Sequence, residues 1–330
     1  MKLFSILRTP NKTTTENLRQ KMADSAFTTK TAADWWGKCR RVKVLDGEMS
    51  YYDSDPEQKH SHAVVFLHGD PTSSFLWRNV IPHVAPVARC LAPDLIGMGR
   101  SSKRANHSYR AEDHYRYLSE WFDSVKLPAK VNLVIHDWGS ILGFHWGHMH
   151  NDRVDSITYM EALLRPWVMD DTIPEEVRNL TVALRSEAGD EMVLKNNYMI
   201  EKFIPGLVMR KLSEDEMNAY REPYVNPGED RRPTLTFTRE IPIEGDGPEY
   251  MVKIANDYFD YFREAKHIPK LCITGDPGCI AILKFIDMWP NQQKVSVKGT
   301  HFLQEDSPKE IGEAVKEFLT NTVIHHHHHH

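Results

Sequence analysis

The stretch VNLVIHDWGS, residues 131–140, decides the fold. Its first half is a β-branched and apolar run of the kind that forms a short buried strand. Asp137 follows this run, and Gly139 begins a segment whose apolar residues recur with a helical period. Strand, abrupt turn and helix with an acid at the apex predict a nucleophile elbow, in which strained backbone exposes the apical side chain. Small neighbours favour such a turn, and Gly139 is small but Ile135 is not. The alternative is that Asp137 only caps the helix.

Length, charge and cysteine content limit the classes of protein that the chain can form. Its 330 residues carry a net charge of −5 with both signs dispersed, which argues against nucleic acid as a partner. The four cysteines show no CxxC or zinc-ligand spacing, so we expect a reduced, cytoplasmic setting. No apolar run approaches the roughly 20 residues that span a bilayer, so we expect no membrane partner. Residues 1–30 are predicted to be a flexible N-terminal tail, and residues 325–330 are a histidine tag.

Outward from the elbow, strand-type and helix-type segments alternate along the chain. The expected strands are a hairpin around Asp46-Gly47 and the segments 62–69, 89–94, 131–135, 156–162, 270–276 and 294–299. The expected helices that accompany them are 73–84, 108–125, 140–150 and 311–323. This alternation predicts an α/β fold with a mostly parallel central sheet flanked by helices on both faces.

One long interval, residues 163–265, interrupts this alternation. It is helical and charged, with its clearest helices at 175–186 and 213–224. A helical insertion between two core strands is expected to form a cap over the carboxyl ends of the strands, where open α/β sheets bind ligands. The predicted organisation is therefore a core of residues 31–162 and 266–324 with an inserted helical cap of residues 163–265.

Nucleophilic chemistry at Asp137 needs a base and an acid that orients the base. His301 follows the last predicted strand, where this architecture carries its histidine. Two carboxylates compete for the orienting role, because Glu161 and Asp276 each end a predicted strand. Asp276 lies in Gly-Asp-Pro-Gly, which turn chemistry alone explains. An unpaired charge at the position of Glu161 would be costly, so we favour Glu161.

The loop after the first long strand, HGDPTSSFLWR (68–78), is expected to place backbone N–H groups beside the nucleophile. Asp70 in this loop would project into the pocket next to Trp138, whose indole N–H is a donor. An ionised Asp70 would repel an anion there, unless burial keeps the carboxyl protonated. The alternative is that Trp138 serves only to pack the interior.

These segments together resemble a known family. The loop of residues 68–78, LAPDLIGMGRSS (91–102), HDWGS (136–140) and KGTHFLQED (298–306) are similar to haloalkane dehalogenases of the α/β-hydrolase superfamily. One branch, the Renilla-type coelenterazine luciferases, is more similar still. The cap carries this closer likeness in EMVLKNNYMIEKFIP (191–205), MRKLSEDEMNAYREPY (209–224) and RRPTLTFTREIPI (231–243).

The resemblance runs from about Trp35 to Val323 and implies the α/β-hydrolase fold. It also implies a catalytic triad of Asp137, Glu161 and His301. The substrate-binding contacts that it implies are Asp70 and Trp138.

The chain departs from the pattern of this branch at several positions. Asp70 stands where the relatives have Asn, and Ile135 replaces a glycine of the elbow. Leu180 stands where the luciferases have a cap aspartate, while Glu176 keeps a carboxylate one turn earlier. Phe-Thr replaces Trp-Pro at residues 237–238, and the loop after Asp276 is shorter and carries Cys279 in place of an aromatic residue. These changes bear on the substrate more than on the fold.

The resemblance implies a luciferase that oxidises coelenterazine with dioxygen to coelenteramide, carbon dioxide and blue light, without a cofactor and without a metal. The alternative enzyme is a haloalkane dehalogenase, in which Asp137 displaces halide and water activated by His301 cleaves the resulting ester. A developing halide needs hydrogen-bond donors, and Asp70 supplies none unless it is protonated, which favours the luciferase. A ligand-binding or storage protein is the third reading, and the Asp–Glu–His set argues against it. The expected partner is a small-molecule substrate. The oligomeric state stays open, with a monomer as the expectation.

Overall fold

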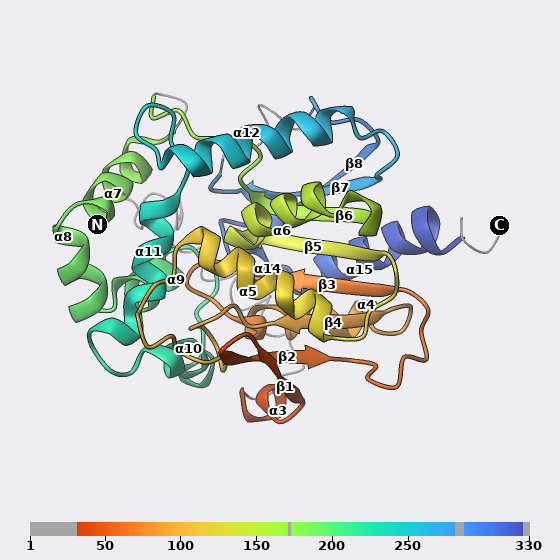
Figure 1. Ribbon diagram of the computed structural model, residues 1–330, viewed down its shortest axis with the longest axis horizontal. Helices are drawn as coiled ribbons and strands as arrows, with labels where there is room; N and C mark the ends of the chain where they lie inside the picture. Colours follow the sequence, from red (N-terminus) through yellow and green to blue (C-terminus); the bar gives the residue numbers. More distant parts are fainter. Residues whose placement is uncertain (1–31, 171–172, 281–286, 326–330) are drawn as a thin grey trace.

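A mixed sheet runs through the middle of the protein (Figure 1). The computed structural model describes residues 32–170, 173–280 and 287–325. The predicted tail of residues 1–30, and residues 326–330 of the tag, lie outside these residues. Within the described part the sheet has eight strands in the order β1-β2-β4-β3-β5-β6-β7-β8. Their bounds are β1 Cys39–Val44, β2 Gly47–Asp53, β3 Ala63–Leu67, β4 Arg89–Pro93, β5 Val131–Asp137, β6 Val154–Ala162, β7 Lys270–Pro277 and β8 Gln292–Gly299.

The direction of the strands places their carboxyl ends at one edge. β1 and β2 form the expected antiparallel hairpin, and β2 also pairs antiparallel with β4. The pairs from β4 through β3, β5, β6 and β7 to β8 are all parallel. The chain steps from β3 to β4 on one side and then crosses to β5 on the other, so the strand order reverses at β3. Ligand sites of open α/β sheets lie at such a reversal.

The two faces of the sheet carry separate apolar layers. In β3, Val65 and Leu67 belong to one hydrophobic cluster, whereas Val64 and Phe66 belong to the other, as the period of two in a strand requires. The first cluster is covered by α5 (Ala111–Ser124), α6 (Trp138–Met149) and α12 (Glu249–Glu264). The second is covered by α3 (Ala32–Trp36), α4 (Ile81–Val84) and α15 (Pro308–Leu319). The predicted α/β fold with helices on both faces is confirmed.

The predicted helix over residues 73–84 is wrong. The segment forms a 3₁₀ turn, Ser74–Trp77, and the short helix α4. Proline at position 82 has no N–H to donate to the carbonyl of Arg78, so one continuous helix is excluded. Ser73 caps the 3₁₀ turn by accepting a hydrogen bond from the backbone N–H of Phe75.

The helices between β6 and β7 lie mostly at the edge where the parallel strands end. These are α7 (Glu175–Arg185), α8 (Ala188–Asp190), α9 (Ile204–Gly206), α10 (Glu214–Arg221) and α11 (Arg232–Glu240), grouped on the left in Figure 1. The predicted boundary at residue 265 also assigns α12 to the cap, but α12 packs on the core. Tyr258 and Phe262 lie 5.3 and 5.6 Å from the ring of Phe144 in α6. The helical layer of the core therefore resumes with α12.

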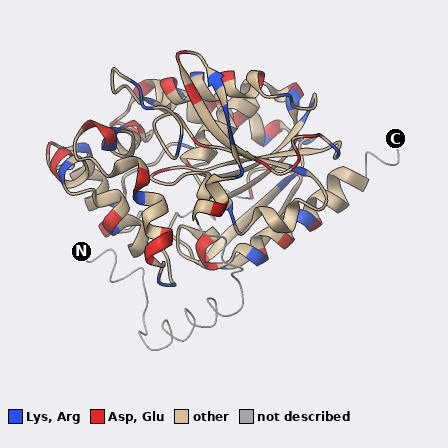
Figure 2. Cartoon of the chain, turned by 90° about the horizontal axis from the view of Figure 1, so that it is seen from below, with Lys and Arg blue, Asp and Glu red and all other residues tan. Residues whose placement is uncertain are grey.

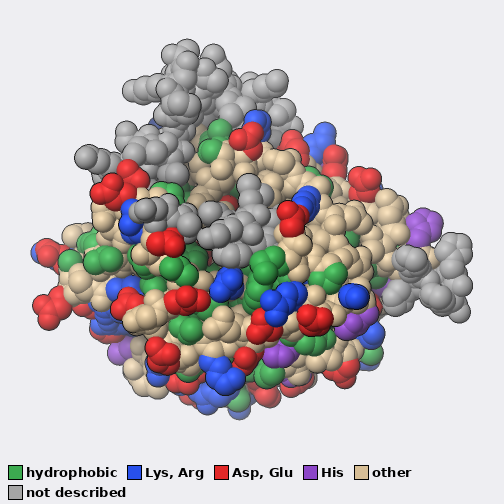
Figure 3. All heavy atoms as spheres, turned by 90° about the horizontal axis from the view of Figure 1, so that it is seen from above, with side chains coloured by type: hydrophobic (Ala, Val, Ile, Leu, Met, Phe, Trp, Pro, Cys, Tyr) green, Lys and Arg blue, Asp and Glu red, His purple; other side chains and the backbone are tan. Residues whose placement is uncertain are grey.

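Charged residues of both signs are interspersed among the described residues in the views of Figure 2 and Figure 3. In Figure 2 the positions of Lys and Arg lie among those of Asp and Glu along the ribbon. On the face shown in Figure 3, hydrophobic side chains are interspersed with charged ones. None of the described helices combines the length and apolarity needed to cross a membrane.

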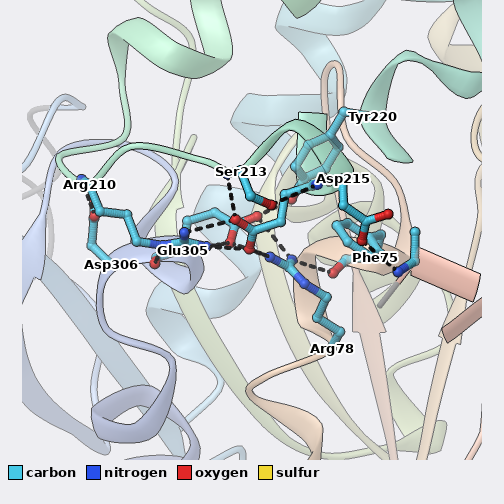
Figure 4. A network of polar contacts seen from close by, with 10 residues as sticks. Phe75, Arg78, Arg210, Ser213, Asp215, Tyr220, Glu305 and Asp306 are labelled. Carbon is cyan, nitrogen blue, oxygen red and sulfur yellow. Dashed lines mark hydrogen bonds and ion pairs between the residues drawn. The ribbon is translucent and has the colours of Figure 1, made fainter. Parts of the chain in front are cut away.

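A buried cluster of charges joins the cap to the core (Figure 4). Arg78, from the core, lies 2.9 Å from Glu305 and 2.5 Å from Glu216 of α10. Arg210, from the cap, lies 2.9 Å from Glu305 and 2.6 Å from Glu216. Burial raises the pKa of Glu216, but Arg210 and Arg78 lower it to about 2, so the carboxylate stays ionised. Each buried charge thus has two partners of opposite sign.

This cluster continues into the segment that follows His301. Glu305 and Asp306 belong to α14 (Leu303–Asp306). The carboxylate of Asp306 accepts hydrogen bonds from the backbone N–H groups of Met209 and Arg210, at 2.8 and 2.9 Å. The backbone carbonyl of Leu207 accepts one from the hydroxyl of Thr300 at 2.5 Å. The cap segment 207–210 is therefore bound at both ends to the loop that carries the histidine.

Removal of one member of this cluster should destabilise the protein strongly. Arg78→Met leaves Glu305 and Glu216 buried with half their countercharge, and such a loss costs about 3–5 kcal/mol. The measurement is the free energy of unfolding from urea denaturation. The control is Lys253→Met, because Lys253 pairs with Asp257 on the surface and should contribute less than about 1 kcal/mol. Equal losses in the two variants would contradict the account of the cluster.

Candidate active site

Asp137 sits at the sharp turn between β5 and α6. Its φ is +54° and its ψ is −129°, a conformation that a side-chain-bearing residue adopts only when its surroundings impose it. The turn brings α6 directly onto β3, since a Cβ at Gly139 would lie 2.3 Å from the carbonyl oxygen of Leu67. Ile135 fits because α6 offers Gly143 opposite it, where a Cβ would lie 2.8 Å from the Ile135 side chain. The predicted elbow is present despite Ile135.

The side chain of Asp137 does not cap the helix. It makes no capping hydrogen bond to the first turn of α6. One carboxylate oxygen lies 3.0 Å from Nε2 of His301, and the other accepts a hydrogen bond from the backbone N–H of Asp70 at 2.9 Å. Gly69 makes this approach possible, because a Cβ there would lie 2.3 Å from the Asp137 carboxylate. The carboxylate is therefore directed at the histidine and at the loop after β3.

The structure places Glu161, and not Asp276, beside His301. Nδ1 of His301 lies 2.8 Å from Oε1 of Glu161. Glu161 ends β6 in a positive-φ conformation, with φ of +41°, and also accepts backbone hydrogen bonds from Cys279 at 3.2 Å and Ile280 at 3.0 Å. Asp276 is exposed and pairs with Lys298 at 2.5 Å. Two carboxylates thus flank one imidazole.

The protonation of these groups follows from burial and proximity. Burial lowers the pKa of His301, but hydrogen bonds to Asp137 and Glu161 outweigh it and raise the pKa to about 9. Burial raises the pKa of Asp137, but the hydrogen bond and charge of His301 bring it below its ordinary value. Burial keeps the pKa of Glu161 above its ordinary value despite the same partner. At neutral pH the site therefore holds an imidazolium between acidic side chains.

A cavity of about 340 Å³ opens above this group, between the sheet and the cap. Asp137, His301, Asp70 and Trp138 line its floor. Its cap wall is mostly apolar, with Val177, Leu180, Leu184, Met199 and Phe203 among the residues that face it. Cavities of roughly 300–1,000 Å³ hold organic ligands of drug size. The arrangement suits a substantially apolar substrate whose reacting atoms meet the acid and the histidine.

Asp70 is a buried carboxyl without a compensating cation. It is 4% exposed, and its Oδ1 has no hydrogen-bond partner in the described part of the chain. Burial, and then the charge of Asp137, raise the pKa of Asp70 well above its ordinary value. The carboxyl is therefore neutral at a pH where an exposed aspartate is ionised.

Trp138 lines the cavity and also packs against an aromatic side chain of the cap. Its ring stacks on Phe237 of α11, with centroids 4.8 Å apart, and Phe237 stacks in turn on His114 at 4.4 Å. The Phe-Thr pair at residues 237–238 therefore affects the cavity in two ways. Phe237 packs on Trp138, and Thr238 lines the cavity directly. Cys279 lines the cavity as well.

Some contributors to the site have no signal in the sequence. The backbone N–H groups of Cys279 and Ile280 hold Glu161, and a backbone donor depends on the path of the loop rather than on residue type. His136 is buried, and its Nε2 lies 2.9 Å from the carbonyl oxygen of His301, which fixes the backbone of the histidine. In the sequence, only the position of His136 directly before Asp137 points to a role in the site.

Comparisons with known proteins agree with this geometry. Residues 62–308 match the family model of the alpha/beta hydrolase fold. The coelenterazine h 2-monooxygenase of Renilla reniformis is 44% identical over 292 residues, which cover 88% of this chain and 93% of that protein. A haloalkane dehalogenase of Sphingobium indicum is 45% identical over 293 residues, which cover 86% and 96%.

Solved structures give the same result. The haloalkane dehalogenase of Bradyrhizobium elkani superposes with a TM-score of 0.81 at 34% identity, covering 87% of this chain and 99% of that one. The fold, the elbow and the sequence likeness point in one direction. The chain belongs to the α/β-hydrolase family, within the group that contains the haloalkane dehalogenases and the Renilla coelenterazine monooxygenase.

Proposed function

We propose that this protein is a luciferase-type monooxygenase that converts coelenterazine and dioxygen to coelenteramide, carbon dioxide and blue light without a cofactor. The substrate loses a proton, its anion combines with dioxygen, and the resulting cyclic peroxide expels carbon dioxide. The excited amide anion emits light and takes a proton back. Asp137 and His301 act on protons and charge in this scheme, and no ester forms on Asp137.

The observation that carries the proposal is the cavity of about 340 Å³, which has a mostly apolar cap wall and has Asp137 and His301 at its floor. Cavities of this volume hold organic ligands of drug size, so the cavity admits a substrate larger than a short haloalkane. A dehalogenase must stabilise a departing halide, which requires donors at the leaving group. The neutral carboxyl of Asp70 has one proton to donate there, so Asp70 does not separate the two activities. Sequence identity does not separate the two activities, because the relatives stand at 44% and 45%.

A further feature supports the proposal. The imidazolium of His301, whose pKa is about 9, offers positive charge to a substrate anion beside the cavity floor.

Haloalkane dehalogenation is the second candidate. The specific observation in its favour is the Asp137–His301–Glu161 chain of contacts at 3.0 and 2.8 Å, the arrangement of nucleophile, base and orienting acid. Ester formation on Asp137 would remove its charge, and the pKa of His301 would then fall toward that of a base. A trapped alkyl ester on Asp137 would support this candidate.

The proposal is tested with coelenterazine and protein in air, beside a halide-release assay on a bromoalkane. We expect light and coelenteramide, with the light strongly reduced in Asp137→Ala. Halide release should be weak or absent. Strong halide release together with an alkyl adduct on Asp137, and no light, would overturn the proposal in favour of the dehalogenase.

The orienting acid can be identified by a pair of substitutions. Glu161→Gln removes the charge that holds His301 and should lower kcat by about 100-fold or more, the typical contribution of a positioned acid–base group. Asp276→Asn alters an exposed pair and should leave kcat near its original value. Steady-state light emission measures both. The opposite ranking would refute the assignment of Glu161.

Asp70→Asn tests the buried carboxyl. In the unfolded chain Asp70 ionises near its ordinary pKa, and in the folded protein it stays neutral to a higher pH. The stability of the original protein should therefore fall, relative to the Asn variant, as pH rises from the unfolded toward the folded pKa. A tenfold difference in acidity between the folded and unfolded states corresponds to about 1.4 kcal/mol of stability. Urea denaturation at a series of pH values measures the difference.

The same variant should change activity in two ways. Asn supplies an N–H donor at every pH, so halide release from a bromoalkane should rise, most of all at the higher pH where Asp70 ionises. The decline of activity that accompanies ionisation of Asp70 at higher pH should flatten. If halide release, the pH profile and the stability difference all stay constant, Asp70 has no electrostatic part in the cavity.

A further inference from the structure

A second cavity of about 220 Å³ lies between the helices that cover the sheet. Its walls come from α5 through Ala111 and Tyr115, from α6 through Leu142 and His145, and from α12 through Met251 and Ile254. Ala111, Leu142 and Met251 are buried, whereas Tyr115, His145 and Ile254 are half-buried. The cavity therefore leads from the surface between α5 and α12 toward the interior.

The inner end of this second cavity lies against the catalytic cavity. Ile141 lines both spaces and is itself buried, so its side chain forms a shared wall. Ile141 follows Asp137 by four residues at the start of α6, and residues four apart lie on one face of a helix. Ile141 therefore stands between the second cavity and the catalytic cavity close to Asp137.

The lining of the second cavity selects for small apolar molecules. Most of its residues are aliphatic or aromatic. Burial, and then the nearby His148 and His150, lower the pKa of His145 to about 4, so this ring is uncharged at neutral pH. Glu112, at the exposed rim, is paired with Arg110 at 3.2 Å, so its charge is compensated. The uncharged ring of His145 is a polar group in the wall, and its Nδ1 has no hydrogen-bond partner in the described part of the chain. The rest of the lining is mostly apolar and favours an uncharged ligand.

We propose that the second cavity binds small apolar gas molecules and supplies dioxygen to the catalytic cavity past Ile141. This rests on the proposed function, in which dioxygen reacts with a bulky bound substrate. A substrate that fills the catalytic cavity leaves little room for dioxygen to enter by the same path. Dioxygen is small, uncharged and apolar, and a second apolar route that ends near Asp137 reaches the substrate from the side.

Xenon tests the binding site independently of any enzyme activity, since apolar cavities take up xenon. Crystals of the protein under xenon pressure should show a xenon atom between Ile141 and Met251. The absence of xenon from the second cavity, with xenon present in the catalytic cavity of the same crystals, would overturn the proposal. A protein that emits no light with coelenterazine would refute the proposed function, and the xenon result would still judge the second cavity.

Kinetics test the supply of dioxygen. Tyr115→Trp and Ile254→Trp fill the second cavity from opposite walls without altering the catalytic cavity. At saturating coelenterazine both variants should raise the KM for dioxygen several-fold and leave the KM for coelenterazine unchanged. The matched control is Tyr261→Trp, because Tyr261 is also half-buried and packs on His148, at 4.9 Å, as Tyr115 packs on His145, at 4.3 Å.

An unchanged KM for dioxygen in both filled variants would overturn the proposal, as would an equal rise in the control. If the filled variants do not fold, Ile254→Ala provides the opposite test. It widens the cavity and should lower the KM for dioxygen. A value equal to that of the original protein in this variant would also overturn the proposal.

Discussion

The hydrogen bonds that His301 makes to Asp137 and Glu161 are the constraint on which the arrangement of the site depends. The three residues come from the end of β5, the end of β6 and the loop after β8, so the imidazole joins three segments at one edge of the sheet. Asp137 and Glu161 both have positive φ, with values of +54° and +41°. Two strained residues persist only where packing around them fixes the backbone. Here the contact of Gly139 with β3 and the backbone donors to Glu161 provide that fixation.

The cap contributes to the same constraint from the opposite side. Arg210 and the backbone of residues 207–210 bind the segment that begins with His301, and Glu305 and Asp306 receive most of these contacts. The cavity wall that meets the substrate and the loop that carries the histidine are therefore one connected unit. Burial of the charges makes this connection unfavourable to break, because each would lose its countercharge away from water. The position of the histidine and the shape of the cavity are set together.

Much of this could be predicted from the sequence, and the reasons differ between fold and site. Alternating apolar strands and helices gave the α/β fold, since strand periodicity and chain connectivity are local properties. The turn around Asp137 and the choice of Glu161 over Asp276 followed from residue type at strand ends. The break at Pro82 was missed, although proline chemistry predicts it, because the apolar pattern of residues 73–84 is helical. The accommodation of Ile135 by Gly143, and the backbone donors to Glu161, depend on how distant segments meet, which a single sequence does not encode locally.

The source of the oxygen atom in the product tests the central claim most directly. If dioxygen adds to the substrate and the cyclic peroxide then loses carbon dioxide, the new amide oxygen of coelenteramide comes from dioxygen. Reaction under ¹⁸O₂ in ordinary water, followed by mass spectrometry, should give coelenteramide that carries one ¹⁸O atom. In ¹⁸O-labelled water under ordinary dioxygen, the amide oxygen should stay unlabelled. Label that enters the product or the Asp137 carboxylate from water, with none from ¹⁸O₂, would show hydrolysis through an ester and would contradict the account.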